Sequence, residues 1–149
     1  MPYPSAALMG RGFQLFMGDG GSPEGFDLIA EVRDFTDLDP RTREFEDVTN
    51  QETPSGGDEV KPAILRGGES TFECNFLPTH ATHDESTGLR ADLVSGARRN
   101  FRAVIPGVPK RFAFAAYVVR FPVAVPVNGV IRGSVTLRMD GAPSWEAHP

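Results

Sequence analysis

From Asp47 to Phe76 the chain reads DVTNQETPSGGDEVKPAILRGGESTFECNF. Its first part is rich in Gly, Pro, Asp and Glu, and its last part alternates between two kinds of side chain. One set is largely apolar and the other polar: Ser70, Phe72, Cys74 and Phe76 against Thr71, Glu73 and Asn75. Because successive side chains of a strand point to opposite faces, this period of two predicts a strand with one buried face.

The polar stretch before that strand, Thr49–Gly67, is predicted to be a long loop. Up to Ala63 its only apolar side chains are Val60 and Ala63. Connections in compact domains are usually about 4–6 residues long, and longer ones are commonly functional or ordered by a partner. We expect this loop to be ordered by a partner, because the rest of the chain offers no reaction centre.

Length and composition indicate one globular domain. The chain has 149 residues, of which 40% are hydrophobic, and no apolar run reaches the roughly 20 residues of a membrane helix. The N-terminus has no basic start followed by an apolar stretch, so no secretory signal is expected. The single cysteine, Cys74, excludes an internal disulfide and suits a reducing compartment.

Charge is divided unevenly along the chain. Residues before Arg98 include 18 acidic and 7 basic side chains, whereas Arg98 and the residues after it include 2 acidic and 8 basic ones. Such a division suits two complementary surfaces that meet when subunits associate head to tail. The alternative is that both charged regions are exposed to solvent and their charges simply cancel overall. We expect the acidic group Glu44, Glu46, Asp47, Asp58 and Glu59 to face arginines of a neighbour such as Arg98, Arg99 and Arg102.

The remaining pattern predicts a mainly β chain with one helix. Alternation or turn-bounded apolar runs predict strands at 12–18, 26–35, 44–50, 68–77, 100–105, 110–121, 123–127 and 130–140. Residues 82–99 change to a helical period, most securely over Leu89–Ser95. The fold class is therefore an antiparallel β-sandwich or small barrel with one flanking α-helix.

Candidate chemistry is confined to His80–Glu85, where two histidines and two carboxylates lie within six residues. They could bind a metal, but a polar helix start explains the same residues. No nucleophile elbow or phosphate loop is present in the sequence, so no catalytic residue, metal or cofactor is expected. The alternative function is a small β-barrel ligand-binding module or a metal-dependent hydrolase that uses this cluster. Trp145 would cap the core or contact a neighbour.

The order of these elements resembles the major tail tube protein of long-tailed bacteriophages. The features that carry the resemblance are the VTN stretch before the Gly/Pro/acidic loop, the strand STFECNF, the single helix and the closing DGAPSW. The resemblance covers nearly the whole chain and includes gene-transfer particles, whose tails use the same parts. It implies a tail tube fold, shared with the tube of type VI secretion, and a structural, non-enzymatic role.

The resemblance also implies the partners. Six subunits would close into a ring, and rings would stack head to tail around a tape-measure protein, with a tail terminator and distal tail or baseplate proteins at the ends. DNA would pass through the lumen without specific binding, and no membrane would be involved. The protein would lie in the virion tail after assembly in the bacterial host cytoplasm.

By position, two segments match the family's inter-subunit contacts. One is the assembly loop, with Thr49, Pro54, Gly56, Gly57, Asp58 and Glu59. The other is a flexible N-terminal arm over residues 1–10, with Tyr3, Leu8 and Met9. A bore that conducts DNA should not retain phosphates, so acidic side chains are expected to line it. The candidates are Glu31, Glu69 and Glu73, with Arg33 as a partial offset.

Overall fold

A strongly bent antiparallel sheet forms the body of the molecule in this computed structural model, which describes residues 5–54 and 56–148. The strands of the sheet lie in the order β2-β1-β7-β8-β10-β6-β3, and β9 pairs with β10. Their bounds are β1 Gln14–Gly18, β2 Phe26–Leu28, β3 Val32–Thr36, β6 Glu69–Asn75, β7 Arg99–Val104, β8 Lys110–Arg120, β9 Val123–Ala124 and β10 Arg132–Ala147. The chain is therefore mainly β and antiparallel, as the sequence predicts.

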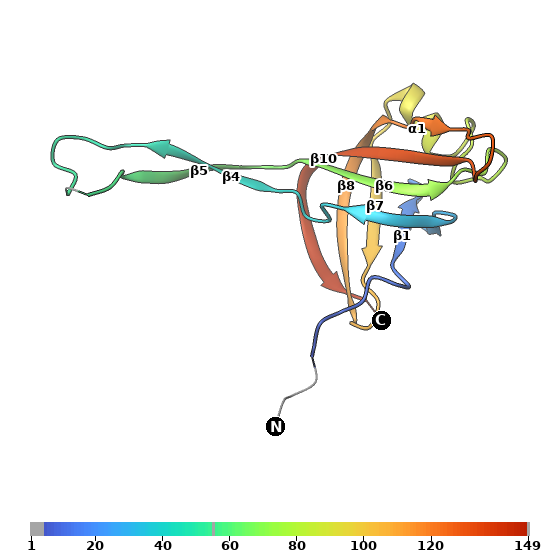
Figure 1. Cartoon of the computed structure of the whole chain (residues 1–149), viewed down its shortest axis with the longest axis horizontal. Helices are drawn as coiled ribbons and strands as arrows, with labels where there is room; N and C mark the ends of the chain where they lie inside the picture. The colour runs from blue at the N-terminus through green and yellow to red at the C-terminus, as the bar shows by residue number, and fades with distance from the viewer. Residues whose placement is uncertain (1–4, 55, 149) are drawn as a thin grey trace.

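The bend divides the sheet into two halves that face each other across the core. β1, β7 and β8 run roughly across the direction of β3 and β6, and the long strand β10 turns from one half into the other (Figure 1). The turn in β10 lies at a register shift between Asp140 and Ser144, where Gly141 has a positive φ of 78°. The inward side chains of both halves fill the space between them: Leu15, Met17, Phe72, Cys74, Phe101, Phe112, Phe114, Val135 and Leu137.

The strand β6 has the predicted two faces. Ser70, Phe72 and Cys74 are buried, and Phe76 packs against the core from just beyond the strand. Along β8 the predicted central position is also confirmed, because β7 and β10 flank it. Its inward residues from Phe112 to Val118 are buried, while Tyr117 and Val119 on the other face are partly exposed.

The helix is shorter than the predicted 82–99. α1 spans Leu89–Ser95 and lies against β8. Gly88, with extended backbone, precedes it, and Gly96 ends it in the left-handed region with φ 72°. Residues 80–88 form turns because the Asp84 carboxylate accepts hydrogen bonds from the backbone N–H groups of Thr87 (2.8 Å) and Gly88 (2.9 Å). Within the described residues no helix has the length and apolarity to cross a membrane.

Two further strand predictions were wrong in their bounds. The predicted strand 26–35 is interrupted, since Glu31 takes a positive φ of 51° and directs the chain from β2 at one edge of the sheet to β3 at the other. The predicted strand 130–140 continues to Ala147, and Trp145 lies opposite Phe112 on β8 with ring centroids 4.8 Å apart. Trp145 thus extends the aromatic packing of its own subunit while remaining 43% exposed.

Candidate assembly surfaces

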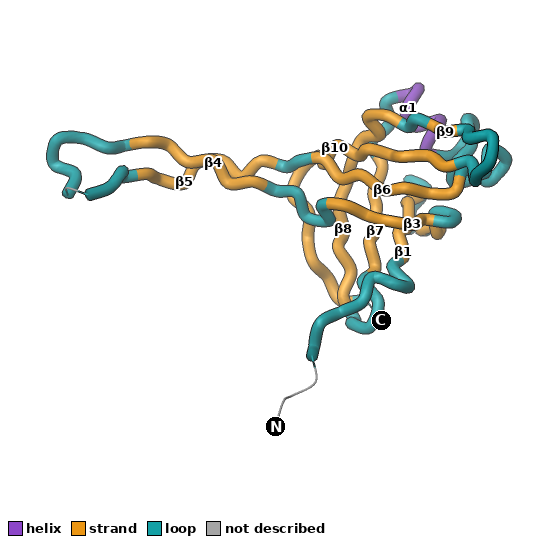
Figure 2. The backbone as a smooth tube through the Cα atoms, in the orientation of Figure 1, coloured by secondary structure: helices purple, strands orange, loops and turns teal. Residues whose placement is uncertain are grey.

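The segment predicted to be a loop is mostly a long β-hairpin. β4 (Thr42–Asp47) and β5 (Val60–Arg66) form a two-stranded sheet of their own, which extends far from the body (Figures 1 and 2). The prediction of a loop over 49–67 is therefore wrong for residues 60–66. Sequence reasoning missed β5 because its residues do not alternate between apolar and polar, although it pairs with β4, the strand that precedes the turn.

One face of the hairpin carries three apolar side chains, beside Arg43 and Asp47, that nothing in the described part of the subunit covers. The strand register places Phe45 opposite Pro62, Asp47 opposite Val60 and Arg43 opposite Leu65. Residues directly opposite each other share a face, so Phe45, Val60 and Leu65 lie together. Phe45 is 59% exposed, and every described residue of both strands is exposed. A solitary two-stranded hairpin is only marginally stable in water, so we expect another surface to cover this one.

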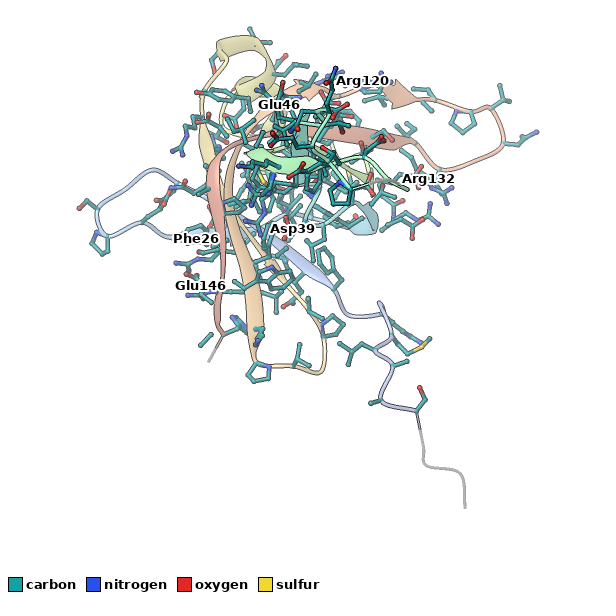
Figure 3. The ribbon with its side chains drawn as sticks, turned by 90° about the vertical axis from the view of Figure 1, so that its left-hand side faces the viewer. Phe26, Asp39, Glu46, Arg120, Arg132 and Glu146 are labelled. Atoms are coloured by element: carbon teal, nitrogen blue, oxygen red, sulfur yellow. The ribbon has the colours of Figure 1, made fainter. Side chains whose placement is uncertain are left out.

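The turn of the hairpin is acidic, whereas the other face of its strands carries both signs of charge, with Glu46 opposite Lys61. Between Glu44 and Val60 the sequence has six carboxylates and no basic side chain. At the base, Arg66 forms an ion pair with Glu44, with Nε and Oε1 2.8 Å apart. Figure 3 looks along the hairpin from its free end, with Glu46 in front of the body. Six of the 18 acidic residues before Arg98 thus lie on this projection.

The turn of the hairpin is organised by its own hydrogen bonds. The backbone N–H of Glu59 donates to Thr49 Oγ1 at 2.8 Å, and Thr53 Oγ1 donates to Glu59 Oε2 at 2.9 Å. Two of the predicted contact residues, Thr49 and Glu59, therefore hold the base of the turn. The others, Pro54, Gly56, Gly57 and Asp58, lie at its exposed tip.

The N-terminal arm lies away from the hairpin, as Figure 1 shows. Leu8 and Met9 are 57% and 79% exposed, and they border a depression of about 610 Å³ that Phe13, Phe35 and Leu38 also line. Of the predicted arm residues, Tyr3 lies outside the described residues. The arm therefore presents apolar side chains beside an apolar surface of the body.

The candidate lumen residues gather on one polar face of the sheet. On β6, Glu69 lies opposite Arg138 and Glu73 opposite Ser134 of β10. Arg33 Nη1 lies 3.8 Å from Glu73 Oε2. Glu31 Oε1 accepts a hydrogen bond from the amide of Asn75 at 3.3 Å, next to this face.

The same face carries more arginines than the sequence suggested. Arg138 lies opposite Glu69, Arg132 lies opposite Asn75, and Arg120 of β8 lies opposite Thr136 of β10. We expected Arg33 to be the one arginine that offsets the charge of the glutamates. This expectation was wrong, because the strand register also brings the arginines of β8 and β10 beside the glutamates. The face has three glutamates and four arginines, so its formal charge is +1 and it is not acidic.

The cluster His80–Glu85 is built as a structural turn. His83 is fully buried: its Nδ1 accepts the backbone N–H of Leu77 at 3.1 Å, and its Nε2 donates to the Ala30 carbonyl at 3.0 Å. Burial lowers the pKa of His83, and the hydrogen bond to Ala30 opposes this only in part. Across the described residues, no group of three or more His, Cys, Asp or Glu is placed to bind a metal.

Cys74, the one cysteine, is also structural. It is fully buried beside the core phenylalanines, and burial raises the pKa of its thiol to about 11. The thiolate is the reactive form, so this cysteine is poorly suited to nucleophilic chemistry.

The arginines expected to meet the acidic group already have carboxylates in their own subunit. Arg98 Nε lies 2.7 Å from Asp140, and Arg102 Nε lies 3.7 Å from Glu146. Arg99 forms an ion pair with Asp92. Arg98 and Arg99 are therefore poor receivers for a neighbour's acidic segment, whereas Arg102 shares Glu146 with Arg111, whose Nε lies 2.6 Å from the same oxygen.

Comparison of the structure with solved structures identifies the fold. A chain from the tail of an empty gene transfer agent particle with C6 symmetry has a TM-score of 0.75 at 21% identity, covering 95% of this chain and all of that one. A chain of a native gene transfer agent virion gives 0.73 at 20% identity with the same coverage. The SPP1 tail tube gives 0.71 at 12% identity, covering 95% of this chain and 80% of that one.

These similarities lie in the structure and not in the sequence. No family model and no curated protein matches the chain. Because the three structures are covered over most of their length, the similarity is not limited to a shared substructure. The chain therefore has the tail tube fold.

Proposed function

We propose that this protein is a structural subunit of a phage-type tail tube, in which rings of six subunits stack head to tail. The observation that carries the proposal is the β4–β5 hairpin, a long projection with an uncovered apolar face on a body of tail tube fold. Burying a large apolar side chain contributes about 1.5–3 kcal/mol, so covering Phe45 and its neighbours favours assembly. The C6 symmetry of the similar tail supports six subunits in a ring.

The proposed contacts are the turn and the arm. Pro54, Gly56, Gly57 and Asp58 are the exposed tip that meets a neighbour, with Thr49 and Glu59 shaping it. Leu8 and Met9 of the arm contact the same or an adjacent subunit. The residues act by packing and charge, without catalysis and without a cofactor.

The remaining parts of the proposal concern the finished particle. The tube encloses a tape-measure protein, ends in a terminator and a distal tail or baseplate, and conducts DNA within a virion tail assembled in the host cytoplasm. The face that carries Glu31, Arg33, Glu69 and Glu73 lines the bore. Glu73 pairs with Arg33 and Glu69 lies opposite Arg138, so these glutamates would weaken the hold of the neighbouring arginines on a polyanion.

Negative-stain microscopy of the concentrated full-length protein tests the proposal directly. We expect rings or striated tubes with an open bore. Featureless monomers over the whole concentration range, in protein whose folding is verified by circular dichroism, would contradict a tube-forming role.

A further inference from the structure

The end of the molecule opposite the hairpin carries a second projection. The connection between β9 and β10, residues 125–131, lies at the far end of the longest axis (Figures 1 and 2). Four aliphatic side chains in these seven residues are exposed: Val125 70%, Val127 98%, Val130 55% and Ile131 41%. Isolated apolar residues are common on surfaces, but four in one short loop form a patch that indicates an interaction site.

This valine loop is flanked by positive charge. Between Val119 and Gly133 the sequence contains Arg120 and Arg132 and no acidic residue. Both arginines are exposed, and Figure 3 shows them on the body near this loop. Within residues 5–54 and 56–148, neither has an ion pair in the subunit, in contrast to Arg98, Arg99 and Arg102. Glu73 lines a small depression together with Arg132 at the base of the loop and forms its own pair with Arg33.

The base of the loop is firmly fixed to the body. Arg90 Nη1 donates to the Phe121 carbonyl at 3.1 Å, and its guanidinium lies 5.2 Å from the centroid of the Phe121 ring. Gly133 has no space for a side chain, since a Cβ there would lie 2.3 Å from the Phe121 ring. The valine loop is therefore presented from a rigid support.

The two projections match each other in chemistry. The hairpin has an apolar face with Phe45, Val60 and Leu65 and a turn region with six carboxylates. The valine loop has four exposed aliphatic side chains between two free arginines. Their positions at opposite ends of the same molecule allow one copy to contact the next in a head-to-tail manner, which is the contact type that propagates.

We propose that the valine loop of one copy receives the β4–β5 hairpin of the next copy. The apolar face of the hairpin packs on Val125, Val127, Val130 and Ile131, while its carboxylates pair with Arg120 and Arg132. This inference rests on the proposed head-to-tail stacking and identifies the receiving surface. In this contact Arg120 and Arg132 take the place of Arg98, Arg99 and Arg102 as the arginines that meet the acidic group.

Cysteine cross-linking tests the contact, since the native Cys74 is buried and adds little background. In the double variant Asp58→Cys/Val127→Cys, each subunit has one thiol on the hairpin and one on the valine loop. A short bis-maleimide added to assembled tubes is expected to give a ladder of covalent multimers on denaturing gels, because each copy links to two others. The single variants should stop at unlinked subunits, or at dimers where like thiols meet by chance.

A matched control places the second thiol elsewhere. Leu28 is 46% exposed on β2 and belongs to neither projection, so Asp58→Cys/Leu28→Cys should give no ladder. Tubes of the Asp58→Cys/Val127→Cys variant that form normally but give no ladder would overturn the proposed contact while leaving the tube function intact. A wild-type protein that forms no tubes would instead count against the function itself.

Charge reversal provides an independent readout. Arg120→Glu/Arg132→Glu should slow tube growth about tenfold or more, because complementary charge governs encounter. Adding Glu46→Lys/Asp47→Lys to the same chain should restore a large part of the rate. The control Arg11→Glu/Lys110→Glu makes the same change in net charge at exposed positions outside the loop, and it should have little effect. Equal slowing by both double variants, without rescue, would show a net-charge effect and overturn the pairing.

Discussion

Arg99 and Asp92 form a buried ion pair that joins the start of β7 to the helix. Arg99 Nη2 lies 2.8 Å from Asp92 Oδ1, and Nη1 of the same guanidinium donates to the Gly18 carbonyl at 3.0 Å. Asp92 is 2% exposed, and its burial raises the pKa of the carboxyl, which the hydrogen bond and charge of Arg99 oppose. One arginine thus ties α1, β7 and the end of β1 together.

Replacing Arg99 should destabilise the subunit more than replacing its sequence neighbour. Arg99→Met leaves the Asp92 carboxylate buried without its partner, and we expect a loss of about 3 kcal/mol in the free energy of unfolding. Arg98→Met removes a half-exposed pair with Asp140 and should cost at most about 1 kcal/mol. Denaturant unfolding of both variants measures the difference. Equal losses of unfolding free energy in the two variants would show that burial does not determine how much the Arg99–Asp92 pair contributes to stability.

Shortening the turn of the hairpin should separate folding from assembly. Deletion of Pro54–Asp58 retains Thr49 and Glu59, whose hydrogen bonds hold the two strands, and touches no core residue. Thermal unfolding should shift little, whereas tube growth followed by light scattering should be abolished. Val94→Ser, at a side chain 87% exposed on α1, is a surface control that should leave growth unchanged. Normal polymerisation of the shortened protein would refute the assembly role of the turn.

Acid should weaken the subunit through His83. Burial lowers its pKa in the folded state below the ordinary value of 6.5, so the unfolded chain binds more protons as the pH falls. The stability that neutral His83 contributes is therefore complete above pH 6.5 and is lost as the pH falls toward the folded-state pKa. Denaturant unfolding from pH 7.5 to pH 5 should show this loss.

The variant His83→Phe isolates this effect. It leaves the Leu77 N–H and the Ala30 carbonyl unpaired, which should cost about 1–3 kcal/mol at pH 7.5. All other titratable groups are common to both proteins, so their contributions largely cancel in the comparison. The gap between wild type and variant should narrow as the pH falls. A constant gap would mean that His83 does not titrate differently on folding.

The proposed bore predicts an effect of glutamates on DNA. The variant Glu69→Gln/Glu73→Gln leaves Arg138 and Arg33 without the carboxylates beside them. Tubes of this variant should retain duplex DNA more strongly, with a steeper loss of affinity as salt increases. Asp27→Asn/Glu85→Gln, which removes two exposed charges outside this face and outside both projections, is the matched control. If the control gives the same increase in a retention assay, the DNA contacts lie outside the bore.

The sequence predicted the core better than the edges of the molecule. The alternation in β6 and the apolar content of β8 identify buried residues because a one-residue shift would expose all of them. The break at Glu31 could not be foreseen, since the positive φ depends on contacts with Asn75, 44 residues away. The first turn predicted for the helix fails because the Asp84 carboxylate caps backbone groups in a separate turn.

The assembly surfaces show a different limit. Composition identified residues 49–67 as a segment without a core of its own, but the strand β5 within it was missed because it lies outside any buried face. Trp145 was assigned to the chain beyond the last strand, because Gly141 and Pro143 suggested an end where β10 only bends. Side chains that serve a neighbour, such as Val127, follow no pattern set by the subunit's own core.

The hairpin projects from one end of the subunit only, and this gives any stack a direction. One terminus of the stack displays unoccupied hairpins, which are acidic and apolar, and the other displays unoccupied valine loops, which are basic and apolar. The two open termini are chemically different, so growth at them should proceed at different rates. A protein that closes one terminus would have the wrong charge for the other, and the polarity of the whole structure is already present in a single chain.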